Sequence, residues 1–235
     1  MSHLNSLLEQ RIFRDLKCPS IEQHIVNKAF GADFPSVKEI NKNISLLFVN
    51  ANEFFEFPHP IFNKVIYIGG IVQSKAKPIQ SIVKTILDKS NKGVVLFSFG
   101  SITDTTKMSI AMKQAFLRAF AHFPQYDFIW KFKLGANDSS LLAPNVHLFN
   151  WLDQKAVMEH PNLKAFITHC GMNSINEAAH AGVPMVAVPL FGDQLFNAAL
   201  VKHKAIGEYV DIRQAEDPQV IIDALHRVLN KPIYR

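Results

Sequence analysis

The chain has 235 residues, 48% of them hydrophobic, enough to bury the core of one large domain or of one domain with an appendage. It contains 25 Lys and Arg against 20 Asp and Glu, and this small, scattered excess does not indicate nucleic-acid binding. The two cysteines, Cys18 and Cys170, have neither a metal-binding spacing nor a disulfide pattern, so we expect buried free thiols.

The first residues do not have the layout of a signal peptide, and no apolar stretch approaches the ~20 residues that span a bilayer. The apolar run from Val183 to Phe191 is interrupted by Pro184 and Pro189. The sequence as given is therefore expected to be soluble.

The N-terminal part of the chain lacks a regular alternation of elements. Two helical patterns cover residues 2–34, residues 44–50 predict a buried strand, and residues 65–70 predict a short strand stopped by two glycines. We place a domain boundary near Gly70, between a first part, residues 1–70, and a second part, residues 71–235.

Beyond Pro78, apolar strands alternate with amphipathic helices. This alternation predicts an α/β fold, a Rossmann-like doubly wound parallel sheet. The predicted strands cover residues 94–99, 128–132, 146–149, 165–168, 185–188 and 208–210. The predicted helices cover residues 79–88, 107–122, 155–159, 173–181 and 194–204, with a last helix that Asp217 caps and Pro218 begins.

In an open parallel sheet, ligands bind beyond the carboxyl ends of the strands. Four loops at these ends contain polar or aromatic residues that a core would not need. They are Gly100–Ser101, Asn150–Trp151, His169–Ser174 and Pro189–Gln194.

The loop over residues 169–174 is the strongest candidate site, because a glycine-containing turn that opens a helix presents N–H groups to a phosphate. His169, Asn173 and Ser174 add side-chain donors, and each hydrogen bond to a charged oxygen contributes ~1.5–3 kcal/mol. Glu177, one helical turn on, could accept from two ribose hydroxyls. In the alternative interpretation, Ser174 and Glu177 form a capping pair and His169 is a hydrogen-bonded residue at the end of a strand.

Trp151 follows a strand, where an indole can stack on a base for ~1–3 kcal/mol, although a lone tryptophan also suits an ordinary core. Asp193 and Gln194 could bind sugar hydroxyls, or Asp193 could cap the helix that follows it. The pair Lys131 and Lys133 predicts a solvated face.

Other nucleotide and metal sites are not indicated. The sequence contains no GxGxxG motif, no GxxxxGK[ST] motif and no HExxH motif. We therefore assign no dinucleotide site, no P-loop and no metal ligand.

Taken together, the loops resemble the donor signature of the UDP-glycosyltransferase family, and the spacing from Trp151 to Gln194 matches that of the family's donor box. Flanking segments at residues 58–70 and 97–101 also resemble family sequences. The motifs that support the resemblance are Trp151–Gln154, His160–Pro161, Phe166–Ser174, Glu177, Gly182–Pro184 and Pro189–Gln194.

The resemblance implies a role for each residue of the donor box. Trp151 would stack on uracil, Gln154 would lie by the nucleoside, and Glu177 would bind the ribose hydroxyls. The other expected donor-site residues are Ser101, His169, Asn173 and Ser174 at the diphosphate, Gly171 at the start of the helix, and Asp193 and Gln194 at the transferred sugar.

The resemblance also implies a fold and a reaction. The chain would be the C-terminal, donor-binding half of a GT-B fold with a remnant of the N-terminal domain. The enzyme would transfer a hexose or glucuronate from a UDP-sugar to a hydroxyl of a small lipophilic acceptor with inversion, without a further cofactor. The full-length form would belong to the endoplasmic reticulum membrane, on its lumenal side.

The family's catalytic base is a histidine, oriented by an aspartate, in the N-terminal domain. No such arrangement occurs before Gly70, so we expect no catalytic residue in this chain and little activity from the chain alone. The alternative is a donor-binding module that requires a separate acceptor-domain partner or acts as a homo-oligomer.

Two residues depart from the family pattern. Asp153 stands where the family usually has proline, and it adds a negative charge near the expected diphosphate. Cys170 stands where the family often has glycine. Both are loop changes that a donor site is expected to accept.

Overall fold

The computed structural model describes residues 18–69, 77–133 and 143–234. The chain divides into two compact units, residues 1–49 with 60–66, and residues 50–59 with 67–235. Gly70, where the sequence places the domain boundary, lies outside the described residues, as does the first helical pattern up to residue 17. Within the described ranges, no helix has the length and apolarity to cross a bilayer.

The first unit contains α2 (Cys18–Phe30), α3 (Val37–Lys42) and the strand β1 (Leu47–Val49), which pairs with β2 (Val65–Tyr67). The strand expected to be buried over residues 44–50 is shorter and is not buried, since Phe48 is 59% exposed. The prediction of burial was wrong because β1 belongs to a two-stranded sheet, whose faces are left open by the described part of the chain.

The second unit is built on a six-stranded parallel sheet in the order β5-β4-β3-β6-β7-β8. This is the strand order of the doubly wound nucleotide-binding fold, and it confirms the fold predicted from the sequence. The strands are β3 (Val94–Ser98), β4 (Asp127–Lys131), β5 (Val146–Phe149), β6 (Leu163–Thr168), β7 (Met185–Ala187) and β8 (Gly207–Tyr209).

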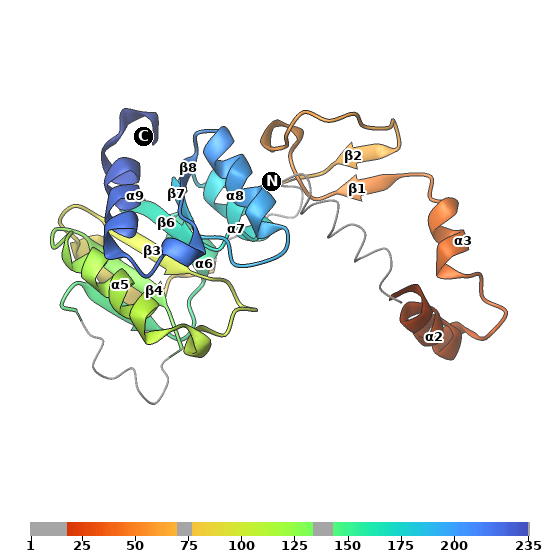
Figure 1. Ribbon diagram of the computed structural model, residues 1–235, viewed down its shortest axis with the longest axis horizontal. Helices are drawn as coiled ribbons and strands as arrows, with labels where there is room; N and C mark the ends of the chain where they lie inside the picture. The colour runs from red at the N-terminus through yellow and green to blue at the C-terminus, as the bar shows by residue number, and fades with distance from the viewer. Residues whose placement is uncertain (1–17, 70–76, 134–142, 235) are drawn as a thin grey trace. The chain divides into compact units, whose positions relative to one another are not determined.

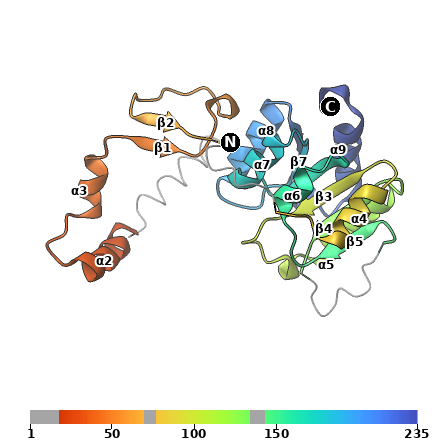
Figure 2. The same ribbon diagram turned by 180° about the vertical axis from the view of Figure 1, so that it is seen from behind.

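Helices cover both faces of this sheet, as the two opposite views show (Figures 1 and 2). On one face of the sheet, α5 (Ile110–Ala121) and α9 (Pro218–Asn230) pack against the strand side chains that point to that face. The other face is covered by α4 (Ser81–Lys89), α6 (Gln154–Met158), α7 (Met172–His180) and α8 (Gln194–His203). Short 3-10 turns are Glu53–Phe55, Thr105–Lys107, Ile212–Gln214 and Pro232–Tyr234.

Aromatic rings fill the core between β3, β4 and α5. Phe97 stacks on Trp130 with ring centroids 4.7 Å apart and lies 4.6 Å from Phe116, while Phe120 stacks on Phe128 at 4.1 Å. Such pairs add ~0.5–1.5 kcal/mol beyond the area they bury. The ends of β3 and β4 that carry the site loops are therefore held by a closely packed core.

Every helix and strand predicted beyond Pro78 is present, with small shifts at the ends. The predicted helix at residue 107 begins at Ile110, because the Ser109 side chain accepts from the Met112 N–H and fixes the start there. The last helix is capped by Asp217 and begins with Pro218, as predicted.

Cys170, directly after β6, has a backbone φ of +65° and a fully buried side chain. A left-handed conformation costs a residue with a Cβ ~1–2 kcal/mol, whereas glycine adopts it freely. This accounts for the glycine that the resemblance leads us to expect at this position. Burial also raises the pKa of the Cys170 thiol, so the thiol stays protonated.

We predict that Cys170→Gly is more stable than Cys170→Ala by about 1 kcal/mol. Both variants lose the same buried sulfur, but only glycine relieves the left-handed backbone. Urea unfolding of the two variants measures the difference. The matched control is Ala119→Gly inside α5, where glycine should instead lower the free energy of unfolding by about 1 kcal/mol or more. If Cys170→Gly is less stable than Cys170→Ala, the backbone of Cys170 is not strained.

Candidate functional site

The site lies where the strand order of the sheet reverses. β3 and β6 are neighbours, and Ser98 pairs in register with Thr168. The loops that follow these strands therefore leave the sheet side by side, at the point where open α/β sheets bind their ligands. This brings together the loops at Gly100 and His169, which the sequence predicts to be functional.

The imidazole of His169 is packed between two glycines. A Cβ on Gly100 would lie 2.7 Å from His169 Cε1, and a Cβ on Gly171 would lie 2.7 Å from His169 Nε2. Gly100 also has a φ of +80°. A larger residue at either position would therefore have to displace the His169 ring, and at Gly100 it would also adopt an unfavourable backbone conformation.

His169 is not the hydrogen-bonded strand-end residue of the alternative interpretation. Its Nδ1 is buried and has no partner among the described residues. Burial lowers the pKa of His169, Asp193 opposes this, and Lys131 lowers the pKa further. Buried polar nitrogens are rarely left without a partner in folded proteins, so the unpaired Nδ1 of a neutral imidazole is an unusual feature of this site.

The first turn of α7 is open to a ligand. Gly171 is the N-cap residue, and it provides no side-chain cap. The helix geometry leaves the first N–H groups without partners inside the helix, and the helix dipole adds partial positive charge there. Asn173 is exposed in this turn, while Ser174 is buried.

Ser174 and Glu177 do not form the capping pair of the alternative interpretation. Both side chains accept hydrogen bonds from Gln154 Nε2, at 3.2 Å to Ser174 Oγ and 2.7 Å to Glu177 Oε2. Gln154 is the first residue of α6, so its amide joins α6 to α7. The three residues that the sequence assigns to the donor are thus brought together.

Asp153, which replaces the usual proline, is the N-cap residue of α6. Its Oδ1 accepts from the Ala156 N–H at 3.0 Å. Proline and a capping carboxylate both favour a helix start, the first through its fixed φ and the second through its hydrogen bond. The negative charge of Asp153 is therefore directed at the positive end of α6.

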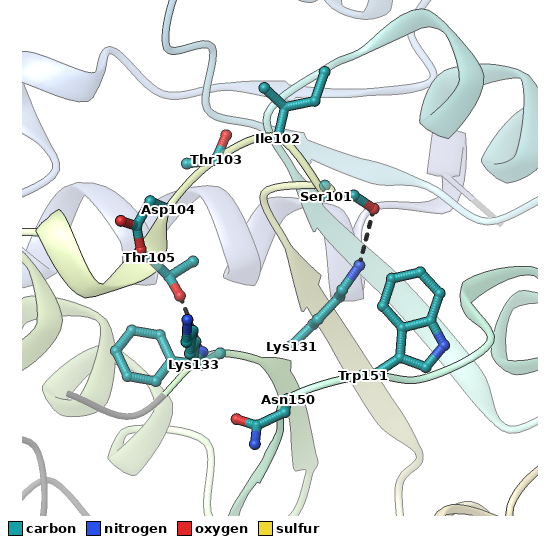
Figure 3. Close-up of a pocket in the computed structure, with 11 residues that line it drawn as sticks. Ser101, Ile102, Thr103, Asp104, Thr105, Lys131, Lys133, Asn150 and Trp151 are labelled. Atoms are coloured by element: carbon teal, nitrogen blue, oxygen red, sulfur yellow. Dashed lines mark hydrogen bonds between the residues drawn. The ribbon is translucent and has the colours of Figure 1, made fainter.

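Trp151 is not part of the core, since its side chain is 62% exposed. Lys131 Nζ lies 4.3 Å from the centroid of the Trp151 ring and donates to Ser101 Oγ at 3.3 Å (Figure 3). The prediction that Lys131 belongs to a solvated face was wrong. Burial lowers the pKa of Lys131, and the nearby Glu177 raises it.

A pocket of about 290 Å³ opens beside this cluster, at the carboxyl ends of β3, β4 and β5. The main chain of Lys133 donates to Thr105 Oγ1 at 3.0 Å and joins two of its walls. The first turn of α7 is not part of the pocket lining. It is lined by Gly100, Ser101, Ile102, Thr103, Asp104, Thr105, Lys131, Phe132, Lys133, Asn150 and Trp151.

Asp193 and Gln194 have different structural positions. Gln194 is 5% exposed, and its Oε1 accepts from the N–H groups of Leu190 and Phe191, which fixes the loop before α8. Asp193 is exposed at the N-cap position, yet its side chain makes no capping hydrogen bond. The expected cap is therefore absent, and Asp193 is the more accessible of the two residues.

Sequence reasoning missed two residues, Lys131 and Asn197. Asn197 is buried and donates both to the Cys170 carbonyl, at 3.0 Å, and to Asp193 Oδ2, at 2.9 Å. Its position four residues after Asp193 was the signal that could have identified it. Lys131 could have been found because it ends a strand next to the strand that precedes Ser101.

The described part of the chain contains no group of three or more His, Cys, Asp or Glu side chains that could hold a metal ion. The polar groups gathered at the switch point are instead a helix terminus, an ammonium group, hydroxyls and an imidazole. These groups bind oxyanions and hydroxyls.

A family model described as "UDP-glucoronosyl and UDP-glucosyl transferase" matches residues 2–235. The chain is 32% identical to UDP-glucuronosyltransferase 3A1 of Xenopus laevis, covering 98% of this chain and 43% of that protein. It is 38% identical to the ecdysteroid UDP-glucosyltransferase of Lymantria dispar multicapsid nuclear polyhedrosis virus, covering 80% of this chain and 37% of that protein. The chain thus spans about two fifths of the length of these relatives.

Solved structures share the fold. The glycotransferase of kitacinnamycin has a TM-score of 0.69 at 21% identity, covering 99% of this chain and 59% of that chain. A UDP-glucose: anthocyanidin 3-O-glucosyltransferase, solved in complex with UDP, has a TM-score of 0.59 at 22% identity, covering 72% of this chain and 40% of that chain. With the family model matched over almost the whole length, the chain belongs to the UDP-glucuronosyl and UDP-glucosyl transferase family.

Proposed function

We propose that this chain binds a UDP-sugar at the switch point. The uracil stacks on Trp151, the ribose hydroxyls bind Glu177, and the diphosphate lies at Ser101, His169 and the first turn of α7. The observation that supports this best is that the sheet topology brings these groups, from three separate loops, to one edge.

We further propose that the complete protein transfers a hexose or glucuronate to a hydroxyl of a small lipophilic acceptor with inversion. The acceptor oxygen attacks the anomeric carbon, the bond from that carbon to the diphosphate breaks, and UDP leaves. The α7 terminus, with its partial positive charge, would stabilise charge on the departing diphosphate. A base must accept the proton of the acceptor hydroxyl.

The described residues offer no suitable base beside this site. His147 pairs with Asp127 at 2.8 Å, but these residues lie near the amino ends of β5 and β4, away from the site edge. His59 contacts the Phe57 carbonyl at 2.7 Å and the Tyr67 hydroxyl at 3.3 Å. We propose that the base belongs to the remainder of a longer protein, or to a separate acceptor-domain partner.

The printed names of the relatives include UDP-glucuronosyltransferase. On this likeness we propose that the full-length form is associated with the endoplasmic reticulum membrane, on its lumenal side. Fractionation of cells that produce the full-length protein, with protease protection of the vesicles, tests this location.

Trp151→Ala is expected to weaken UDP binding tenfold or more, because base stacking contributes ~1–3 kcal/mol. Isothermal titration calorimetry measures the affinity. Trp151→Phe, which keeps an aromatic face, is the matched control and should retain most of it. Because the side chain is exposed, both variants should remain folded; unchanged affinity in folded Trp151→Ala excludes the stacking.

UDP should bind far more tightly than uridine. Either His169→Ala or Ser174→Ala should reduce the ratio of UDP affinity to uridine affinity. Burial lowers the pKa of His169 in the free protein, so the ring is neutral at pH 7. A bound diphosphate favours the protonated ring and raises this pKa, so proton uptake accompanies binding. UDP affinity should therefore rise as the pH falls from about 8 to about 6.

The matched control for this pH dependence is His169→Gln. The ligand phosphate itself titrates near pH ~6, and the variant shares that titration. The ratio of wild-type to variant affinity should therefore increase toward low pH. If the ratio of wild-type to His169→Gln affinity for UDP does not change with pH, or if UDP and uridine bind equally well, the diphosphate does not lie at His169 and the first turn of α7.

The purified chain alone should form no glycoside at a useful rate. A general base typically contributes ~10²–10⁴-fold, and positioning of the acceptor contributes more. The assay follows UDP release and glycoside formation from UDP-glucose or UDP-glucuronate with a panel of phenols. Turnover of about 1 per second or faster would show that the base lies in this chain, and His59 and His147 would be replaced first.

A further inference from the structure

Lys131 has a fixed place at the end of β4. Its neighbours in sequence, Trp130 and Phe132, are both buried in the aromatic core. Because side chains alternate along a strand, Lys131 points to the other side. There its Nζ lies against the Trp151 ring and donates to Ser101 Oγ (Figure 3).

The Trp151 ring is in contact with the Lys131 ammonium. Trp151 stands in the short connection between β5 and α6, and Lys131 makes the polar contact to its ring in the described part of the chain. At 4.3 Å from the centroid, the ammonium is well within the range of a cation–π interaction. With 62% of its side chain exposed, Trp151 still offers surface to a ligand.

We infer that Lys131 is a positioning residue for the base platform: its ammonium, held by Ser101, supports one face of the Trp151 ring and leaves the opposite face for uracil. This inference rests on the proposed function. It assigns to Lys131 a contribution to nucleoside binding that does not require a phosphate in the ligand.

Two other roles of Lys131 predict different results. If the ammonium binds the diphosphate directly, its loss weakens UDP and leaves uridine unchanged. If the ammonium covers the face that the base needs, its loss strengthens uridine binding. The comparison of uridine with UDP therefore separates the three roles by the sign and the ligand dependence of the effect.

The test uses the full 235-residue chain with Lys131→Met, which keeps the length of the side chain but removes its charge. A cation–π contact at a partly exposed site predicts that uridine affinity falls about two- to fivefold. UDP affinity should fall by at least the same factor. Lys131→Arg should restore uridine binding, and Lys107→Met, outside the pocket, controls for the loss of one positive charge.

A second measurement reports on the ring itself. The chain has two tryptophans, and Trp130 is buried, so acrylamide quenching of fluorescence reads Trp151 selectively. Quenching should increase in Lys131→Met and return to the wild-type value in Lys131→Arg. Urea unfolding confirms that both variants are folded.

Unchanged or tighter uridine binding in Lys131→Met overturns the inference, and so does unchanged quenching. A wild-type chain that binds neither UDP nor uridine contradicts the proposed function itself. If such a chain still shows increased quenching in Lys131→Met, Lys131 orders the Trp151 ring but the ring does not bind a base. The inference about nucleoside binding would then fail together with the proposed function. Loss of UDP affinity alone would assign Lys131 to the diphosphate.

Discussion

The packing of one imidazole between two glycines determines the geometry of the proposed donor site. His169 follows β6, Gly100 follows β3, and Gly171 is the N-cap residue of α7. A methyl group at either glycine would lie 2.7 Å from an atom of the ring, so both loops approach the imidazole more closely than a residue with a Cβ would allow. Burial lowers the pKa of this ring and so favours its neutral form.

Three primary amides hold the surrounding loops in place. Gln154 joins α6 to Ser174 and Glu177, Asn197 joins Asp193 to the Cys170 carbonyl, and Gln194 fixes the turn before α8. Gln194 and Asn197 are buried, and their hydrogen bonds to neighbouring loops satisfy polar groups that burial would otherwise leave unpaired. Part of the donor signature therefore stabilises the loops, and its more accessible groups are the ones that we propose bind the ligand.

The sequence predicted the fold well because most of the apolar strands beyond Pro78 are followed by amphipathic helices, and a parallel sheet covered on both faces is the common way to bury such elements. Its errors were of another kind. Residues 44–50 are apolar but exposed, since apolarity does not say whether a covering layer exists. The role of Lys131 depends on β4 lying beside β3 and β5, a contact between distant segments that no local pattern encodes.

Both departures from the family pattern can be understood from the backbone. At residue 153 the local requirement is a helix start, which the Asp153 carboxylate meets by capping Ala156. At residue 170 the requirement is a positive φ, which Cys170 meets only with strain. Such strain persists only where surrounding contacts hold the backbone in place. Here Asn197 donates a hydrogen bond to the Cys170 carbonyl, and the Cys170 side chain is buried in the core under α7. Each departure is thus accommodated by local contacts: Asp153 caps its own helix, and Cys170 is held by the hydrogen bond from Asn197 and by burial of its side chain.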